Sequence, residues 1–131
     1  MRKEAYVTID TAKLLKEKGF GWRCNRYYDG EDYFVTAAPA NWNDDTETVS
    51  IPTHQMALAW LREKGFHINV SISYDYSVDA DENVVDKWTF WLFKILSSFS
   101  GNLIYTEEVN EYDSYEEAVE AALKYCLENL I

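Results

Sequence analysis

Three segments of the chain carry apolar residues at the spacing of an α-helix. We expect helices over residues 11–18, 54–64 and 115–130. Each is preceded by a residue whose side chain commonly accepts a hydrogen bond from the first turn of a helix, namely Asp10, Thr53 and Ser114. The third start has the strongest signal, because Glu117 follows Ser114 at the spacing of a capping box. The pattern therefore predicts three helices with defined starts.

Between the helices the apolar period changes to two, which is typical of β-strands. Candidate strands are residues 4–9, 20–28, 33–38, 49–51, 66–76, 88–96 and 103–109. In residues 66–76 every second side chain is apolar and the others are polar, as in a strand with one buried and one hydrated face. Residues 88–96 are apolar on both faces, so we expect a loop or a second subunit to cover that strand.

These elements predict an α+β fold in a single domain over residues 1–131. The strands are expected to form one antiparallel sheet of about five members. Two or three helices are expected to cover mainly one face of that sheet. The polar face of residues 66–76 indicates that part of the other face is open.

A six-residue motif, Leu-Lys/Arg-Glu-Lys-Gly-Phe, occurs at residues 15–20 and again at 61–66. In each copy the glycine is predicted to end a helix in the left-handed conformation, with the phenylalanine folded back on the last turn. Seven identities at the same offset lie within residues 15–29. They favour an internal duplication of helix–strand units at residues 8–38 and 54–84. Two independent junctions with the same cap chemistry would give the same pattern.

The chain has a net charge of −11, and its two parts differ in sign. Residues 1–26 hold seven basic and three acidic side chains, whereas residues 27–131 hold five basic and twenty acidic ones. A body of this charge repels phosphate groups and anionic lipids, so we expect neither nucleic acid nor a membrane as partner. It fits a basic protein partner, although surplus carboxylates also keep an aromatic-rich chain soluble without any binding role.

Neither the cysteines nor the apolar runs indicate a secreted or membrane protein. Cys24 and Cys126 are the only cysteines and lack metal-binding spacing, so we expect two buried thiols in a reducing compartment. The first residues lack the apolar run of a signal peptide, and no stretch approaches the roughly 20 apolar residues of a membrane span. These features favour a cytoplasmic protein.

No motif in the chain defines a reaction, a metal or a cofactor. Residues 79–83 begin like a calcium loop, but Val84 stands where that loop needs glycine and Phe90 where it needs glutamate. His54 and His67 have no matching metal-ligand spacing. We therefore predict no catalytic residue, no metal site and no cofactor. A small hydrolase-like enzyme that uses carboxylates or His67 is kept as an alternative.

Candidate partner-binding side chains lie on the polar faces of two strands and in the irregular loop at residues 39–52. They are Arg23, Asn25, Tyr27, Trp42, His67, Asn69 and Ser71. The first three and the last three follow the two copies of the repeated motif, so they would be neighbours if those strands paired. A long loop in a compact domain is often functional. An ordinary hydrated sheet face is the alternative interpretation of the strand residues.

Two stretches resemble a group of small proteins. They are Pro-Thr-His-Gln through Trp-Leu-Arg-Glu-Lys at residues 52–64 and Tyr-Glu-Glu-Ala through Leu-Glu-Asn-Leu-Ile at residues 115–131. These segments resemble small uncharacterised proteins of phages and of integrated elements of gut anaerobes. The shared motifs are structural, so the resemblance implies a cytoplasmic accessory protein and no particular activity.

The sequence as a whole favours a non-enzymatic, acidic protein-interaction module that forms a homodimer and binds a protein partner. The alternative is an inhibitor that mimics nucleic acid and blocks a basic DNA-binding protein. Its charge array would be the acids at positions 107, 108, 111, 113, 116, 117 and 120. High salt weakens ion-pair-driven association steeply, so salt dependence separates the two hypotheses.

Overall fold

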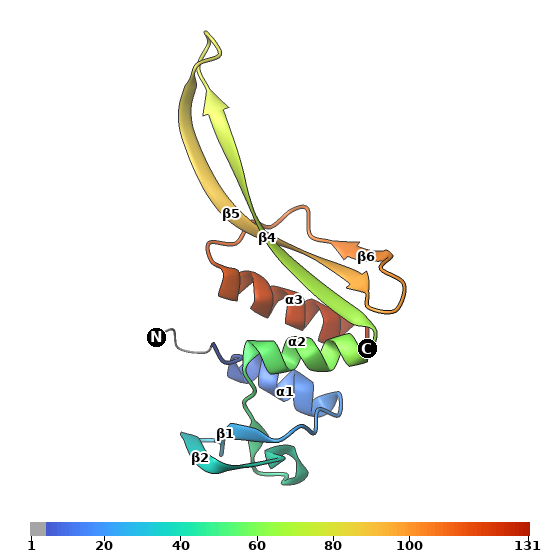
Figure 1. Ribbon diagram of the computed structural model, residues 1–131. Helices are drawn as coiled ribbons and strands as arrows, with labels where there is room; N and C mark the ends of the chain where they lie inside the picture. Colours follow the sequence, from blue (N-terminus) through green and yellow to red (C-terminus); the bar gives the residue numbers. More distant parts are fainter. Residues whose placement is uncertain (1–4) are drawn as a thin grey trace.

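The protein has three layers in a computed structural model that describes residues 5–131 (Figure 1). The middle layer holds the helices α1 (Ile9–Glu17), α2 (His54–Glu63) and α3 (Tyr115–Asn129). On one side lie β1 (Cys24–Tyr28), β2 (Tyr33–Ala40) and β3 (Val49–Ser50), in the order β2-β1-β3. On the other side lie β4 (Phe66–Val78), β5 (Val84–Ser97) and β6 (Leu103–Thr106), in the order β4-β5-β6. A 3-10 helix, η1 (Trp42–Asp44), joins β2 to β3.

The α+β class and the antiparallel strands are confirmed, but the predicted single sheet is wrong. Within residues 5–131, six strands form two sheets of three in place of one sheet of about five. The reason is the path of α2, which carries the chain from β3 across the helical layer to β4 (Figure 1). An alternating pattern shows which side chains share a face, but it does not show which strands pair.

Two helices begin where the sequence predicts. The Thr53 hydroxyl accepts a hydrogen bond from the Met56 N–H at 3.2 Å, and the Ser114 hydroxyl accepts one from the Glu117 N–H at 3.1 Å. These bonds satisfy N–H groups that have no partner within the helix. The chemistry of a single side chain therefore fixes the starts of α2 and α3.

The start of the chain differs from the prediction. α1 begins two residues early, because its cap is Thr8 rather than Asp10, and the Thr8 hydroxyl accepts a hydrogen bond from the Thr11 N–H. The predicted first strand is reduced to a single bridge at Tyr6. Its first residue, Glu4, and the expected absence of a signal peptide concern residues outside those that the structure describes.

The core lies where the helical layer meets the two sheets. The largest fully buried apolar side chains are Phe20, Leu15, Ile51, Leu61, Ile95, Leu123 and Leu127. Full burial of one such side chain contributes about 1.5–3 kcal/mol to stability. Cys24 and Cys126 are buried free thiols, as predicted, and burial raises their pKa values to about 11 and about 12. Both thiols are therefore protonated and inert at neutral pH.

The repeated motif forms the same helix end twice. Gly19 and Gly65 have φ angles of +94° and +104°, so both take the left-handed conformation that the sequence predicts. After the glycine the two copies of the motif differ, because β4 starts at once at Phe66 whereas β1 starts only at Cys24. The two strands also lie in different sheets. The structure thus confirms a shared cap chemistry but does not confirm an internal duplication.

Candidate functional site

The strands β4 and β5 form a long antiparallel hairpin, paired from Phe66 with Ser97 to Val78 with Val84. Its two halves have different surroundings. We call residues 66–71 and 92–97 the base, which lies on the helical layer. We call residues 72–91 the arm, which projects beyond the helices and the rest of the sheet (Figure 1). The arm begins at the pair formed by Ile72 and Trp91.

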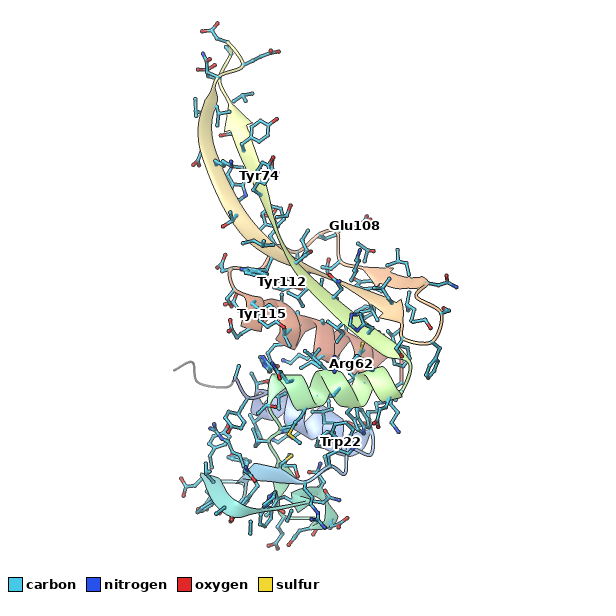
Figure 2. All side chains as sticks on the ribbon, viewed as in Figure 1. Trp22, Arg62, Tyr74, Glu108, Tyr112 and Tyr115 are labelled. Atoms are coloured by element: carbon cyan, nitrogen blue, oxygen red, sulfur yellow. The ribbon has the colours of Figure 1, made fainter. Side chains whose placement is uncertain are left out.

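The base is covered in the ordinary way for a sheet in a folded domain. Ile68, Phe93 and Ile95 are buried against the helical layer. The far side of β5 is also occupied, since β6 pairs with it and the Trp91 N–H donates to the Tyr112 carbonyl at 2.8 Å. Trp91 and Tyr115 meet edge to face, with ring centroids 5.7 Å apart. Figure 2 shows Tyr112 and Tyr115 at the foot of the arm.

On one face of the arm, apolar side chains continue the stripe that is buried in the base. Ile72, Tyr74 and Tyr76 follow Ile68 at every second position, yet each is more than half exposed. Figure 2 shows Tyr74 well away from the helices. The alternation predicts a core face along the whole strand, and for the arm that prediction is wrong. The pattern continues past the point where the helices end.

The other face of the arm is also apolar. Phe90 and Trp88 come from β5 and lie opposite Ser73 and Asp75 of β4. Trp88 is exposed. Three valines near the end of the hairpin, Val78, Val84 and Val85, are exposed too, and Val78 with its pair Val84 continues the first face. Isolated two-stranded hairpins are marginally stable in water, and soluble proteins rarely expose large contiguous apolar patches. A ribbon with apolar side chains on both faces is therefore typical of an interaction surface.

The arm also has open strand edges. Within residues 5–131, β4 pairs only with β5, so the outer edge of β4 is open along its thirteen residues. Beyond the bridge between Trp91 and Tyr112, the distal part of β5 likewise pairs only with β4 among the described residues. An open edge offers a row of N–H and C=O groups to another strand. Short or strongly charged edges prevent such pairing, and β4 is neither.

The tip of the arm is acidic. The residues that resemble the start of a calcium loop form its turn, in which Asp79 Oδ1 accepts hydrogen bonds from the N–H groups of Asp81 and Asn83. Glu82 and Asp86 add two further carboxylates, and Lys87 is the one basic residue of the arm. The tip of the arm is therefore negatively charged, whereas the rest of the arm exposes mainly apolar side chains.

The residues predicted to bind a partner do not form one site. Arg23, Asn25 and Tyr27 lie in or beside β1, whereas His67, Asn69 and Ser71 lie on β4. These strands belong to sheets on opposite sides of the helical layer, so the expectation that the two sets are neighbours is wrong (Figure 1).

Two of the predicted residues do meet each other. The rings of Tyr27 and Trp42 stack with centroids 4.1 Å apart, and the rings of Tyr27 and Phe34 stack with centroids 5.2 Å apart. The Trp42 indole N–H also donates to the Cys24 carbonyl at 2.8 Å. These contacts hold the loop before β3 against the β2-β1-β3 sheet. They give Trp42 a structural role, and its predicted role in binding stays a prediction.

A second group of polar side chains surrounds Glu120 on α3. Its Oε1 lies 2.9 Å from His54 Nε2 and accepts a hydrogen bond from the Thr8 N–H at 2.8 Å. Its Oε2 accepts hydrogen bonds from the hydroxyls of Thr11, at 2.6 Å, and Thr8. The i, i+4 spacing of Glu120 and Lys124 on α3 would suit a surface ion pair, but Lys124 instead lies 4.0 Å from Asp10.

The surroundings of Glu120 keep it ionised. Burial alone would raise the pKa of this carboxyl, but hydrogen bonds from His54, Thr11 and Thr8 outweigh burial and lower it. The carboxylate also lies at the amino ends of α1 and α2, where the helix dipoles favour negative charge. It thereby links all three helices. Its local sequence pattern gives no sign of this, since Thr8 and Thr11 are more than 100 positions away.

The Glu120 cluster borders an open pocket of about 490 Å³. The lining residues are Ala5, Tyr6, Thr8, His54, Tyr112, Glu116, Glu117 and Glu120. A histidine paired with a carboxylate is able to act as a general base toward a nucleophile. The lining provides no serine, cysteine or lysine that could be that nucleophile, and the hydroxyl of its one threonine, Thr8, donates to Glu120 Oε2 and accepts from the Thr11 N–H. The contacts of Glu120 account for the pair as a structural link between helices.

Several carboxylates of the predicted charge array are used within the protein. Glu107 accepts hydrogen bonds from the N–H groups of Val109 and Asn110, and Glu117 accepts one from the Asp113 N–H. Glu120 accepts hydrogen bonds from Thr8 and Thr11 and contacts His54. An array that mimics nucleic acid needs carboxylates free to meet a basic protein. These hydrogen bonds leave the carboxylates charged, and Glu108, Glu111, Asp113 and Glu116 are exposed, so the mimicry hypothesis stays a prediction.

Comparison of the chain with family models, curated proteins and solved structures gives no match. Within residues 5–131, no helix is both long and apolar enough to cross a membrane. The same residues contain no group of three or more His, Cys, Asp or Glu side chains arranged to hold a metal ion. The arm is thus the feature of the structure from which function is best argued.

Proposed function

We propose that this protein is a non-enzymatic protein-interaction module, of the accessory type found in phages and integrated elements, and that the arm is its contact element. One observation carries the proposal. The arm exposes Ile72, Tyr74 and Tyr76 on one face and Trp88 on the other, and it projects past the ends of the helices. Large aromatic side chains of this kind anchor protein interfaces.

The chemistry of the arm favours a protein over other partners. Its one lysine is outnumbered by carboxylates, so a phosphate backbone or an anionic membrane would be repelled. A protein partner offers apolar side chains for both faces of the ribbon and backbone groups for its edges. Addition of a strand to an open sheet edge is a common form of protein recognition.

A photoreactive phenylalanine analogue tests the proposal in cells of the native host. We place it at position 76 in the arm or at position 34 in β2, since Tyr76 and Phe34 are both exposed aromatic residues. On illumination, the probe at position 76 should form discrete protein adducts, because a bound partner lies within reach of the arm. The probe at position 34 is the matched control and should form few. Equal labelling at the two positions, or none at position 76, would overturn the proposal.

A further inference from the structure

We propose that the partner of the arm is a second copy of this chain, paired antiparallel to the first through the outer edge of β4. The inference rests on the proposed function, since it names the occupant of the same arm. Such a dimer joins the β4-β5-β6 sheets of the two protomers into one continuous sheet of six strands. Closed two-fold dimers are the commonest oligomers, and each uses the same surface patch twice.

The sequence of β4 suits pairing with itself. A two-fold axis perpendicular to a sheet keeps each face on its own side, so apolar positions must meet apolar positions. With Ile72 on the axis, Tyr74 lies opposite the partner's Val70. All thirteen residues of β4 then find a counterpart, over a length of about 43 Å at roughly 3.3 Å per residue. The hydrogen bonds between the two protomers would thus come entirely from β4 of each protomer.

No like charges face each other in this arrangement. Asp75 is the only acidic residue of β4, and the same register places it opposite the partner's Asn69. Strands that avoid edge pairing typically carry several charges along the edge or are very short. β4 instead alternates serine and asparagine with apolar residues. The strand therefore lacks the features that keep an exposed edge free.

Charge gives the pairing its direction. Antiparallel pairing brings the tip of one arm to the base of the other, and the tip carries Asp81 and Glu82. Arg62 and Lys64 lie at the end of α2 just before β4, with Glu63 between them, and Lys94 lies on the neighbouring strand of the base. The acidic tip thus meets a basic base twice in each dimer. Parallel pairing would instead bring two acidic tips together, which costs free energy.

Two charge-reversal variants test the arrangement. The tip variant carries Asp81→Lys and Glu82→Lys, and the base variant carries Arg62→Glu and Lys64→Glu. All four side chains are exposed, and none accepts or donates a side-chain hydrogen bond within residues 5–131. A control variant carries Glu31→Lys and Asp32→Lys in the turn between β1 and β2, at the far end of the molecule. Its charge change equals that of the tip variant.

Sedimentation analysis over a range of protein concentrations supplies the dimer Kd at low salt. We expect wild type to form a dimer, and the tip and base variants each to bind themselves at least about tenfold more weakly, a change of about 1.4 kcal/mol. Mixed in equal amounts, the two variants should form a heterodimer close to wild type in affinity, since each tip then meets a base of opposite charge. The control variant should dimerise at least as well as wild type.

The outcomes separate this inference from the proposed function. If wild type stays monomeric at high concentration while the probe at position 76 still yields adducts with another protein, the proposed homodimer is wrong. The proposed function as a protein-interaction module is then supported. If wild type dimerises but the mixed variants do not recover affinity, the antiparallel arrangement is wrong. Adducts of the probe at position 76 that consist of two linked copies of this chain would support the inference directly.

Discussion

The base and the arm of one hairpin share a sequence pattern and differ in what covers them. Ile68 in the base is 8% exposed, whereas Tyr76, eight residues further along the same face of the same strand, is 52% exposed. The helices end between these positions, and the alternation does not. An amphipathic strand is normally explained by the core of its own domain. In this protein the explanation holds for the base, and for the arm we propose that a second molecule provides the cover.

The largest test of this contrast is a pair of aromatic truncations. Phe93→Ala in the base should lower the free energy of unfolding by about 3–5 kcal/mol, because Phe93 is 2% exposed and its loss leaves a cavity. Tyr76→Ala in the arm should cost less than about 1 kcal/mol, the range of strand propensity. Urea denaturation at about 1 μM protein measures both while limiting any stabilisation from self-association. Equal losses for the two variants would show that the arm is buried within the single chain.

Glu120 is the converse case, a charged side chain that the predicted charge array needs on the surface and that the helices largely cover. Glu120→Ala should cost about 2–4 kcal/mol, since it removes one acceptor from several donors and leaves His54 and Thr11 without their partner. Glu116→Ala, on the same helix but exposed, is the control and should change stability by less than about 0.5 kcal/mol. Thermal or urea unfolding of both variants gives the comparison. A small effect at Glu120 would show that the contacts around it contribute little.

The features that sequence predicts correctly are local ones. The caps at Thr53 and Ser114 and the left-handed Gly19 and Gly65 all depend on residues within one helical turn, so their chemistry can be read directly from the chain. The division of the strands into two sheets depends on pairs far apart in sequence, which a periodic pattern does not contain.

The candidate site follows the same rule. The sequence identifies residues 88–96 as apolar on both faces and predicts a second subunit as one possible cover, which anticipates part of the arm. It misses Tyr74 and Tyr76, because alternation gives the face of a side chain and not the extent of the helices that cover it. It also misses the contact between Glu120 and Thr11, whose partners come from opposite ends of the chain.

A smaller test compares the two glycine junctions that lead into the two sheets. Gly19→Ala and Gly65→Ala should each cost about 1–2 kcal/mol, because both residues have positive φ. Gly65→Ala should cost slightly more, since its new Cβ would lie 2.8 Å from Phe99 Cε2, whereas nothing lies within 4 Å at Gly19. Adding Phe99→Ala to Gly65→Ala should remove only this excess. If it does not, the strain at Gly65 comes from the backbone alone.

The last test uses pH to separate the charge of Glu120 from its shape. The folded state lowers the pKa of Glu120 below its ordinary value of 4.5, so its ionised form contributes stability above that pH. The contribution should be lost as the pH falls through the lowered pKa, because the folded and unfolded states then both hold the proton.

Glu120→Gln keeps the size of the side chain but is neutral at every pH, so it serves as the reference. The difference in unfolding free energy between wild type and Glu120→Gln should shrink as the pH falls below about 4, where the carboxyl takes up its proton. Denaturation at a series of pH values measures the difference. Glu107 and Asp29 also have lowered pKa values, but they titrate equally in both proteins and cancel. A difference that stays constant at low pH would mean that Glu120 acts through its hydrogen-bond geometry and not through its charge.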